Sequence, residues 1–275
     1  MNRRERTPGV SFIETKGSDL EKARMRWILF KEKPGPNIVQ HLSELQNRDG
    51  GFSYDMVKGN LSAIDNTLVG LLWMGELGLL ESRMAKRAVA YLLTVQKGDG
   101  GWDEDPSIVK YNLPPWIRVG DLRTRLYLSS YVAYWLAVKG YRNNPAFPRA
   151  LDFILKHQDV TGKFYGYLHT TWIATSVFYM AGPRYRQVTK KGLQFLLGRP
   201  LSEWTDSQVA WALDCLSKAG LPKDHPFVEK SLAELLKRQK PDGSWSSEDG
   251  EWYAVGATIG AIKALKHYGL LPTKS

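Results

Sequence analysis

The stretch that decides the fold is 87-RAVAYLLTVQKGDGGW-102, an amphipathic segment followed by a glutamine, a glycine turn and a tryptophan. Ala88, Tyr91, Leu92 and Val95 recur at helical spacing, with charged residues on the opposite side. The Asp-Gly-Gly sequence that follows is typical of a turn that reverses the chain. The stretch therefore predicts an outward-facing helix that ends in a tight turn.

The same phrase recurs at 46–52, 158–164 and 239–245, with a degraded further copy at 191–204. After the phrases come segments that are apolar nearly all round and end at a glycine: 67–78, 126–140, 170–182, 207–220 and 253–269. A helix without a polar face is buried, and a glycine after a helix commonly adopts a positive φ. Alternating amphipathic and apolar helices predict an all-α fold.

The apolar helices also favour one all-α architecture, an α/α toroid of about six helical hairpins. An inner barrel buries every apolar helix inside the amphipathic ones, whereas an open solenoid leaves one face of each in solvent. The segment 18–32, with Ser18 as its cap, supplies one more inner helix. We expect one α/α-toroid domain over residues 18–275 and a flexible tail over residues 1–17.

Composition excludes several classes of protein. The chain has 275 residues, 43% of them hydrophobic, and a net charge of 38 − 28 = +10, which favours an anionic partner. Its only cysteine is Cys215, which excludes a disulfide framework. Because no apolar run is long enough for a signal peptide or a membrane span, we expect a cytoplasmic protein. Peripheral contact with an anionic membrane stays open, whereas the scattered Lys and Arg residues argue against nucleic-acid binding.

Residues 87–102 resemble the Gln-Trp signature of the squalene and terpene cyclases. Residues 149–164 and 230–245 keep most of this signature, and the resemblance covers roughly residues 18–271. We expect these glutamines and tryptophans to be structural: the Gln bonds free backbone groups at helix ends, and the Trp stacks on the neighbouring hairpin.

The subfamily that the chain resembles most is the class II terpene cyclases, in which an Asp-x-Asp-Asp-Thr-like motif opens an inner helix and its middle aspartate protonates the substrate. In 63-AIDNTLVGLLW-73, Asp65 matches this proton donor and Thr67 matches the threonine, while Ala63 and Asn66 replace the flanking aspartates. The resemblance implies that Asp65 is the general acid in the cyclisation of a linear isoprenoid, with Asn66 as its neighbour. An ordinary helix cap at Ser62, Asp65 or Asn66 explains the same residues without catalysis.

Other candidate site residues lie on the inner helices or at their starts. His169 is a candidate proton relay or hydrogen-bond partner of Asp65, although a lone histidine before two threonines is more often a cap or surface residue. Aromatic rings stabilise carbocations, and arginines bind diphosphate groups. Aromatic rings also simply fill the core, and arginines also occur in solvated loops. The candidate substrate-binding residues are Trp73, Arg123, Arg125, Tyr127, Trp172, Trp252 and Tyr253.

We expect neither a metal nor another cofactor. The β subunit of protein prenyltransferases shares this architecture and binds zinc through an Asp-x-Cys pair and a distant His. Here Cys215 follows Asp214 directly, which is the wrong spacing for such a site. The acidic run Asp103–Asp105 follows a turn and is better explained as a solvated loop or a helix cap than as a magnesium site.

Two classes of function therefore remain. The first is a single-domain class II terpene cyclase-like enzyme, whose short length favours a short isoprenoid or an isoprenoid-tailed aromatic substrate. The second is a non-catalytic α/α toroid that binds a lipid, an isoprenoid or a protein partner. The oligomeric state stays open.

Overall fold

The computed structural model describes residues 7–271 and contains helices α1 to α12 with one two-stranded ribbon. Contacts divide the chain into two compact units. The terminal unit comprises Met1–Ile38 and Leu196–Ser275, and the central unit comprises Val39–Phe195. No helix within residues 7–271 is long and apolar enough to cross a membrane.

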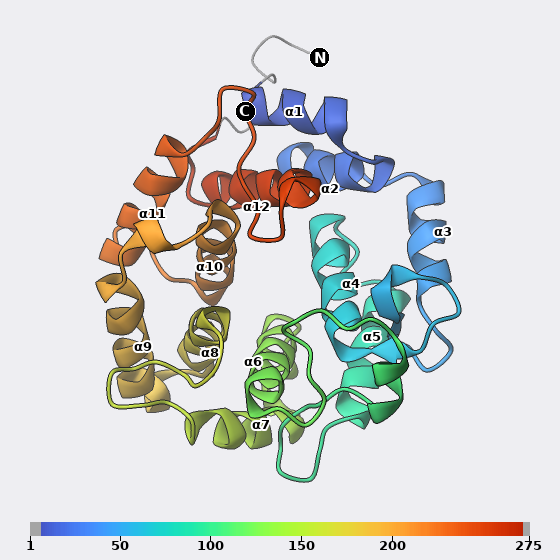
Figure 1. The fold of residues 1–275 in the computed structure, drawn as a ribbon, viewed down its shortest axis with the longest axis vertical. Helices are drawn as coiled ribbons and strands as arrows, with labels where there is room; N and C mark the ends of the chain where they lie inside the picture. Colours follow the sequence, from blue (N-terminus) through green and yellow to red (C-terminus); the bar gives the residue numbers. More distant parts are fainter. Residues whose placement is uncertain (1–6, 272–275) are drawn as a thin grey trace. The chain divides into compact units, whose positions relative to one another are not determined.

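Helices α3 (Pro36–Leu45) and α9 (Arg186–Gly198) each cross a boundary of the central unit. The other elements of this unit are β1 (Phe52–Ser53), β2 (Ser62–Ala63), α4 (Ile64–Glu76), α5 (Arg83–Thr94), α6 (Leu122–Val138), α7 (Ala146–Leu155) and α8 (Leu168–Ala181). Within the unit, α6 packs against α4, α7 and α8 (Figure 1).

The predicted alternation of two kinds of helix is confirmed. Helix α6 is buried without interruption from Leu126 to Ala137, and α8 from Thr170 to Phe178, whereas α5 buries one face only. The glycines predicted to end the apolar helices all have φ between 73° and 99°: Gly78, Gly140, Gly182, Gly220 and Gly269. Consecutive helices pack against each other in several places, as the sequence repeat predicts: α4 on α5, α6 on α7 and α10 on α11.

The terminal unit contains α1 (Pro8–Lys16), α2 (Asp19–Phe30), α10 (Asp206–Ala219), α11 (Pro226–Lys237) and α12 (Ala254–His267). Helix α12 packs against α10, α2 and α1 (Figure 1). Helix α2 begins at the predicted cap: Ser18 accepts a hydrogen bond from the backbone of Glu21, whose side chain accepts one from the Ser18 backbone in return.

The expectation of a flexible tail over residues 1–17 is wrong for residues 8–16, which form α1. Val10 and Ile13 on this helix are 2% and 0% exposed. The physical reason is a close approach to the last copy of the repeat: Gly243 has φ +89°, and a side chain there would collide with the carbonyl of Pro8. Residues 1–6 lie outside the described residues.

The repeated glutamines hold each turn to the next outer helix. The Gln96 side chain donates to the carbonyls of Gly100, 2.8 Å away, and Ala146, 2.9 Å away. Gln46 and Gln158 make the same pair of bonds, to Gly50 and Met84 and to Gly162 and Val188. These bonds satisfy carbonyls in the turn and near the start of the next helix, so the expected structural role of these glutamines is observed.

Candidate active site

The candidate site is built on the first turn of α4. A short ribbon pairs Phe52 with Ala63, and α4 begins at the next residue, Ile64. The Thr67 hydroxyl donates to the Ala63 carbonyl at 2.7 Å and accepts from the Phe52 backbone at 2.9 Å. Thr67 therefore ties the repeat turn to the helix start, and Asp65 faces the neighbouring elements from a fixed first turn.

Two aromatic side chains hydrogen-bond the Asp65 carboxyl. The Tyr127 hydroxyl on α6 donates to Oδ1 at 2.7 Å, and the Trp116 indole donates to Oδ2 at 3.4 Å. Burial raises the pKa of Asp65, and these two hydrogen bonds partly counteract that rise because they favour the carboxylate. The residue as a whole is half-buried, while its carboxyl is desolvated.

Trp116 reaches Asp65 from the segment between Pro106 and Gly120. The Trp116 carbonyl accepts from the Thr124 hydroxyl at 2.8 Å and from the Tyr167 hydroxyl at 3.3 Å. Both bonds fix the segment over the start of α6. Neither Trp116 nor Tyr167 was among the site residues predicted from the sequence. Nothing local to Trp116 indicates which carboxyl it meets.

A second carboxyl, that of Glu104, lies at the start of α4. It accepts from the backbone N–H of Ile64 and of Asp65, each at 2.8 Å, and is 1% exposed. Burial raises the pKa of Glu104 to about 7, although these two backbone bonds lower it. Within the run Asp103–Asp105, the helix-cap interpretation therefore holds for Glu104, and the solvated-loop interpretation does not.

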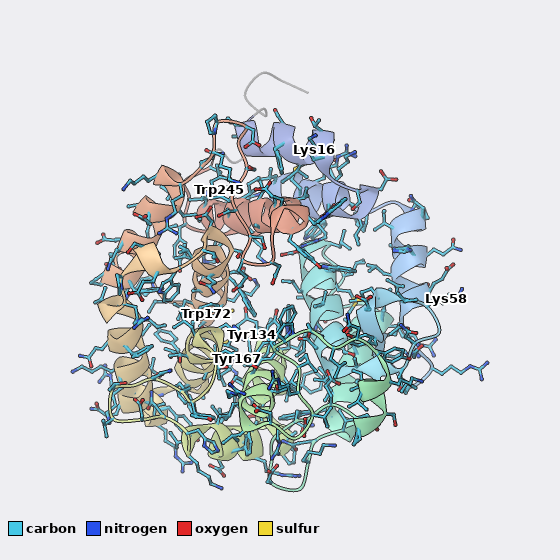
Figure 2. All side chains as sticks on the ribbon, in the orientation of Figure 1. Lys16, Lys58, Tyr134, Tyr167, Trp172 and Trp245 are labelled. Atoms are coloured by element: carbon cyan, nitrogen blue, oxygen red, sulfur yellow. The ribbon has the colours of Figure 1, made fainter. Side chains whose placement is uncertain are left out.

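His169, at the start of α8, packs among aromatic rings and not directly on Asp65. Its ring centroid is 4.8 Å from that of Tyr127, 5.1 Å from Tyr167 and 5.9 Å from Trp172. Burial lowers the pKa of His169 to about 4, so the imidazole is neutral near pH 7. Figure 2 labels Tyr134 on α6, Tyr167 directly before α8 and Trp172 on α8, three aromatic residues of the central unit.

The remaining predicted residues are distributed more widely. Asn66 and Trp73 lie on α4 and are partly accessible. Arg123 pairs with Asp121 at 3.2 Å. Arg125 pairs with Asp99 in the repeat turn at 2.7 Å.

Two further candidates, Trp252 and Tyr253, belong to the terminal unit. They are 95% and 60% exposed, the former being the most exposed large apolar side chain described. Among residues 7–271, no group of three or more His, Cys, Asp or Glu side chains is placed to hold a metal ion.

The chain resembles triterpene cyclases in sequence and type II terpene cyclases in fold. A lanosterol synthase from Candida albicans (strain SC5314 / ATCC MYA-2876) is 29% identical over 130 residues, or 37% of this chain and 18% of the synthase. A squalene–hopene cyclase from Zymomonas mobilis is 24% identical over 220 residues, or 76% of this chain and 28% of that cyclase. The matches thus cover less than a third of each curated relative. No protein-family model matches the sequence.

A solved structure shares the fold. The type II terpene cyclase MstE from Scytonema, in complex with its substrate geranylgeranyl dihydroxybenzoate, has a TM-score of 0.62 and 17% identity. The match covers 92% of this chain and 87% of MstE. The resemblance first seen in the repeat and the predicted fold class are therefore confirmed.

Proposed function

We propose that the protein is a class II terpene cyclase-like enzyme that cyclises a linear isoprenoid, with Asp65 as the general acid. The observation that carries the proposal is the Asp65 carboxyl, which is desolvated, held by Tyr127 and Trp116, and located at the start of a buried helix. Protonating an alkene requires a carboxylic acid that keeps its proton until the substrate arrives, and burial favours that neutral form.

The unequal hydrogen bonds to Asp65 suit a proton transfer from Oδ2. Tyr127 holds Oδ1 at 2.7 Å, whereas Trp116 holds Oδ2 at 3.4 Å, so Oδ2 is the less restrained oxygen. In the proposed step the Oδ2–H bond breaks, the proton joins one alkene carbon, and the positive charge appears on the other. The Tyr127 hydroxyl then stabilises the carboxylate that remains.

Aromatic side chains near Asp65 supply the second requirement, stabilisation of the carbocation. Tyr127 and Trp116 contact Asp65, and Trp73 lies on the same helix. Their ring faces carry partial negative charge that attracts a cation without trapping it covalently. His169 acts through Tyr127 in this proposal, because its ring packs edge-on to that tyrosine and stays neutral.

The substrate class follows from the same surroundings and from the solved relative. MstE binds an isoprenoid joined to a dihydroxybenzoate, and its chain is similar in length to this one. We therefore propose a linear isoprenoid or an isoprenoid-tailed aromatic compound as substrate, protonated without a metal ion. Arg123, Arg125 and Trp172 of the central unit remain candidates for binding it, although Arg123 and Arg125 are already ion-paired. Asn66 remains the candidate hydrogen-bonding neighbour of Asp65.

The test compares wild-type protein with Asp65→Asn on a panel of linear isoprenoids and isoprenoid-tailed aromatics, with a chelator present. We expect cyclic products from wild type and none from Asp65→Asn, whose melting temperature should stay close to wild type. Asp55→Asn is the matched control, because Asp55 is exposed on the same unit and its φ of 55° suits Asn equally well.

Two outcomes would contradict the proposal. If wild type binds these compounds but returns them unchanged, the protein is a binding module of the same fold. If Asp65→Asn retains full turnover, another group supplies the proton.

A further inference from the structure

Glu104 caps a helix to which it does not belong. Helix α4 starts after Ala63, a residue without a capping side chain, so the first backbone N–H groups have no local acceptor. By contrast, α6 and α10 begin with their own caps, Asp121 and Thr205. For α4 the acceptor is the Glu104 carboxylate, which comes from the segment after the next repeat turn and binds Ile64 and Asp65.

The two bonds bear directly on the orientation of Asp65. One oxygen of Glu104 accepts from the N–H of Asp65 itself, and the other from the preceding N–H, each at 2.8 Å. A carboxylate that accepts hydrogen bonds from two successive N–H groups restrains the peptide plane between them. Because its backbone is restrained, the Asp65 side chain is held in the orientation in which it contacts Tyr127 and Trp116.

Glu104 also places a second buried acid beside the first. Like charges disfavour each other, so an ionised Asp65 raises the pKa of Glu104. The ionisable groups that interact electrostatically with Glu104 are Asp65, Asp103, Tyr54, Tyr91 and Tyr127. None of them is a base, so nothing in this set offsets the repulsion between the two carboxyls.

We propose that Glu104 is the positioning residue of the Asp65 site: its two backbone hydrogen bonds hold the first turn of α4 and so orient the Asp65 carboxyl toward Tyr127 and Trp116. This inference rests on the proposed function of Asp65 as general acid. Glu104 itself touches the backbone and not the substrate. It is thus the second carboxyl that the sequence around Asp65 lacks, supplied from a distant turn.

The experiment measures Asp65 directly, by a ¹³C NMR pH titration of its carboxyl, with Asp65→Asn used to assign the signal. We expect Glu104→Gln to raise the titration midpoint of Asp65, because a loosened first turn of α4 weakens the hydrogen bonds from Tyr127 and Trp116 that favour the Asp65 carboxylate. The matched control is Ser82→Ala, which removes the cap of α5 at a distance from the pair. It should leave the Asp65 midpoint unchanged. An unchanged midpoint in Glu104→Gln would overturn the inference.

Kinetics provide the second readout. On a substrate that wild type cyclises, Glu104→Gln should lower kcat by about 100-fold with KM within about twofold, because a misaimed acid affects the chemical step more than binding. An unchanged kcat per folded molecule would also overturn the inference.

A further variant, Glu104→Asp, covers the case in which Glu104→Gln fails to fold. It keeps the carboxylate but shortens the side chain by one methylene, so the two backbone hydrogen bonds weaken and kcat should fall. Unchanged kcat in Glu104→Asp would contradict a positioning role. If wild type has no cyclase activity on any compound, the proposed function fails, and the titration still decides whether Glu104 orients the Asp65 carboxyl.

Discussion

At the scale of single residues, the acid strength of Asp65 is a balance between burial and hydrogen bonding. Burial raises its pKa, while Tyr127 at 2.7 Å and Trp116 at 3.4 Å lower it. The hydrogen bond from Tyr127 is shorter than that from Trp116, so Oδ1 is the more restrained oxygen and Oδ2 is the one that can carry the proton. The reactivity of this carboxyl therefore depends on three residues from separate segments of the chain.

Replacing Tyr127 with phenylalanine tests that balance. Tyr127→Phe removes the bond that stabilises the carboxylate, so the pKa of Asp65 should rise and its acid strength fall. We expect kcat to drop by about 10- to 100-fold, as for the loss of one hydrogen bond to a charged group. Because the protonated form of Asp65 is the active one, the alkaline limb of the pH–rate profile should move to higher pH.

The control for this prediction is Tyr268→Phe in the terminal unit. Tyr268 donates its hydroxyl to the Leu221 carbonyl at 3.3 Å, so the same atom is deleted outside the site. Its kcat and pH profile should match wild type. An alkaline limb that stays in place in Tyr127→Phe would show that this hydroxyl does not tune Asp65.

At the scale of elements, each repeat turn donates a backbone hydrogen bond to a hydroxyl side chain on an inner helix. The backbone N–H of Trp102 donates to Ser129 on α6 at 2.8 Å, and that of Trp245 donates to Thr258 on α12 at 3.1 Å. Phe52 and Phe164 make equivalent bonds to Thr67 and Thr171. This recurrence explains why otherwise apolar helices carry buried Ser and Thr residues, and it positions the acidic segment after Trp102.

Trp102→Ala should destabilise the protein by about 3–5 kcal/mol, measured by chemical denaturation. The side chain is 0% exposed, and its indole donates to the Leu92 carbonyl on α5 at 2.7 Å, so truncation leaves both a cavity and an unsatisfied carbonyl. Trp252→Ala is the matched control, since Trp252 is 95% exposed and its loss should cost less than about 0.5 kcal/mol. Equal stabilities for the two variants would contradict the structural role of Trp102.

At the scale of the whole molecule, the net charge of +10 leads to a prediction about membrane binding that does not depend on the Asp65 site. We expect the protein to co-sediment with vesicles that contain phosphatidylserine and not with vesicles of phosphatidylcholine alone, because the attraction is electrostatic. About 1 M salt, where the Debye length is about 3 Å, should abolish this binding. Binding that persists in high salt, or that is equal for both vesicles, would mean that charge is not its cause.

The sequence by itself determined the helices beyond residue 17, their order, the glycines that end the apolar ones and the place of Asp65 at the start of a buried helix, but not helix α1. Helical periodicity and positive φ at glycine are short-range properties, so they can be inferred from neighbouring residues. Only the tertiary structure decided which side chains surround Asp65. Glu104 and Trp116 are 39 and 51 positions away along the chain, and their local sequences indicate only a turn and an apolar loop. Their meeting at Asp65 depends on how successive hairpins of the central unit pack, which no local pattern specifies.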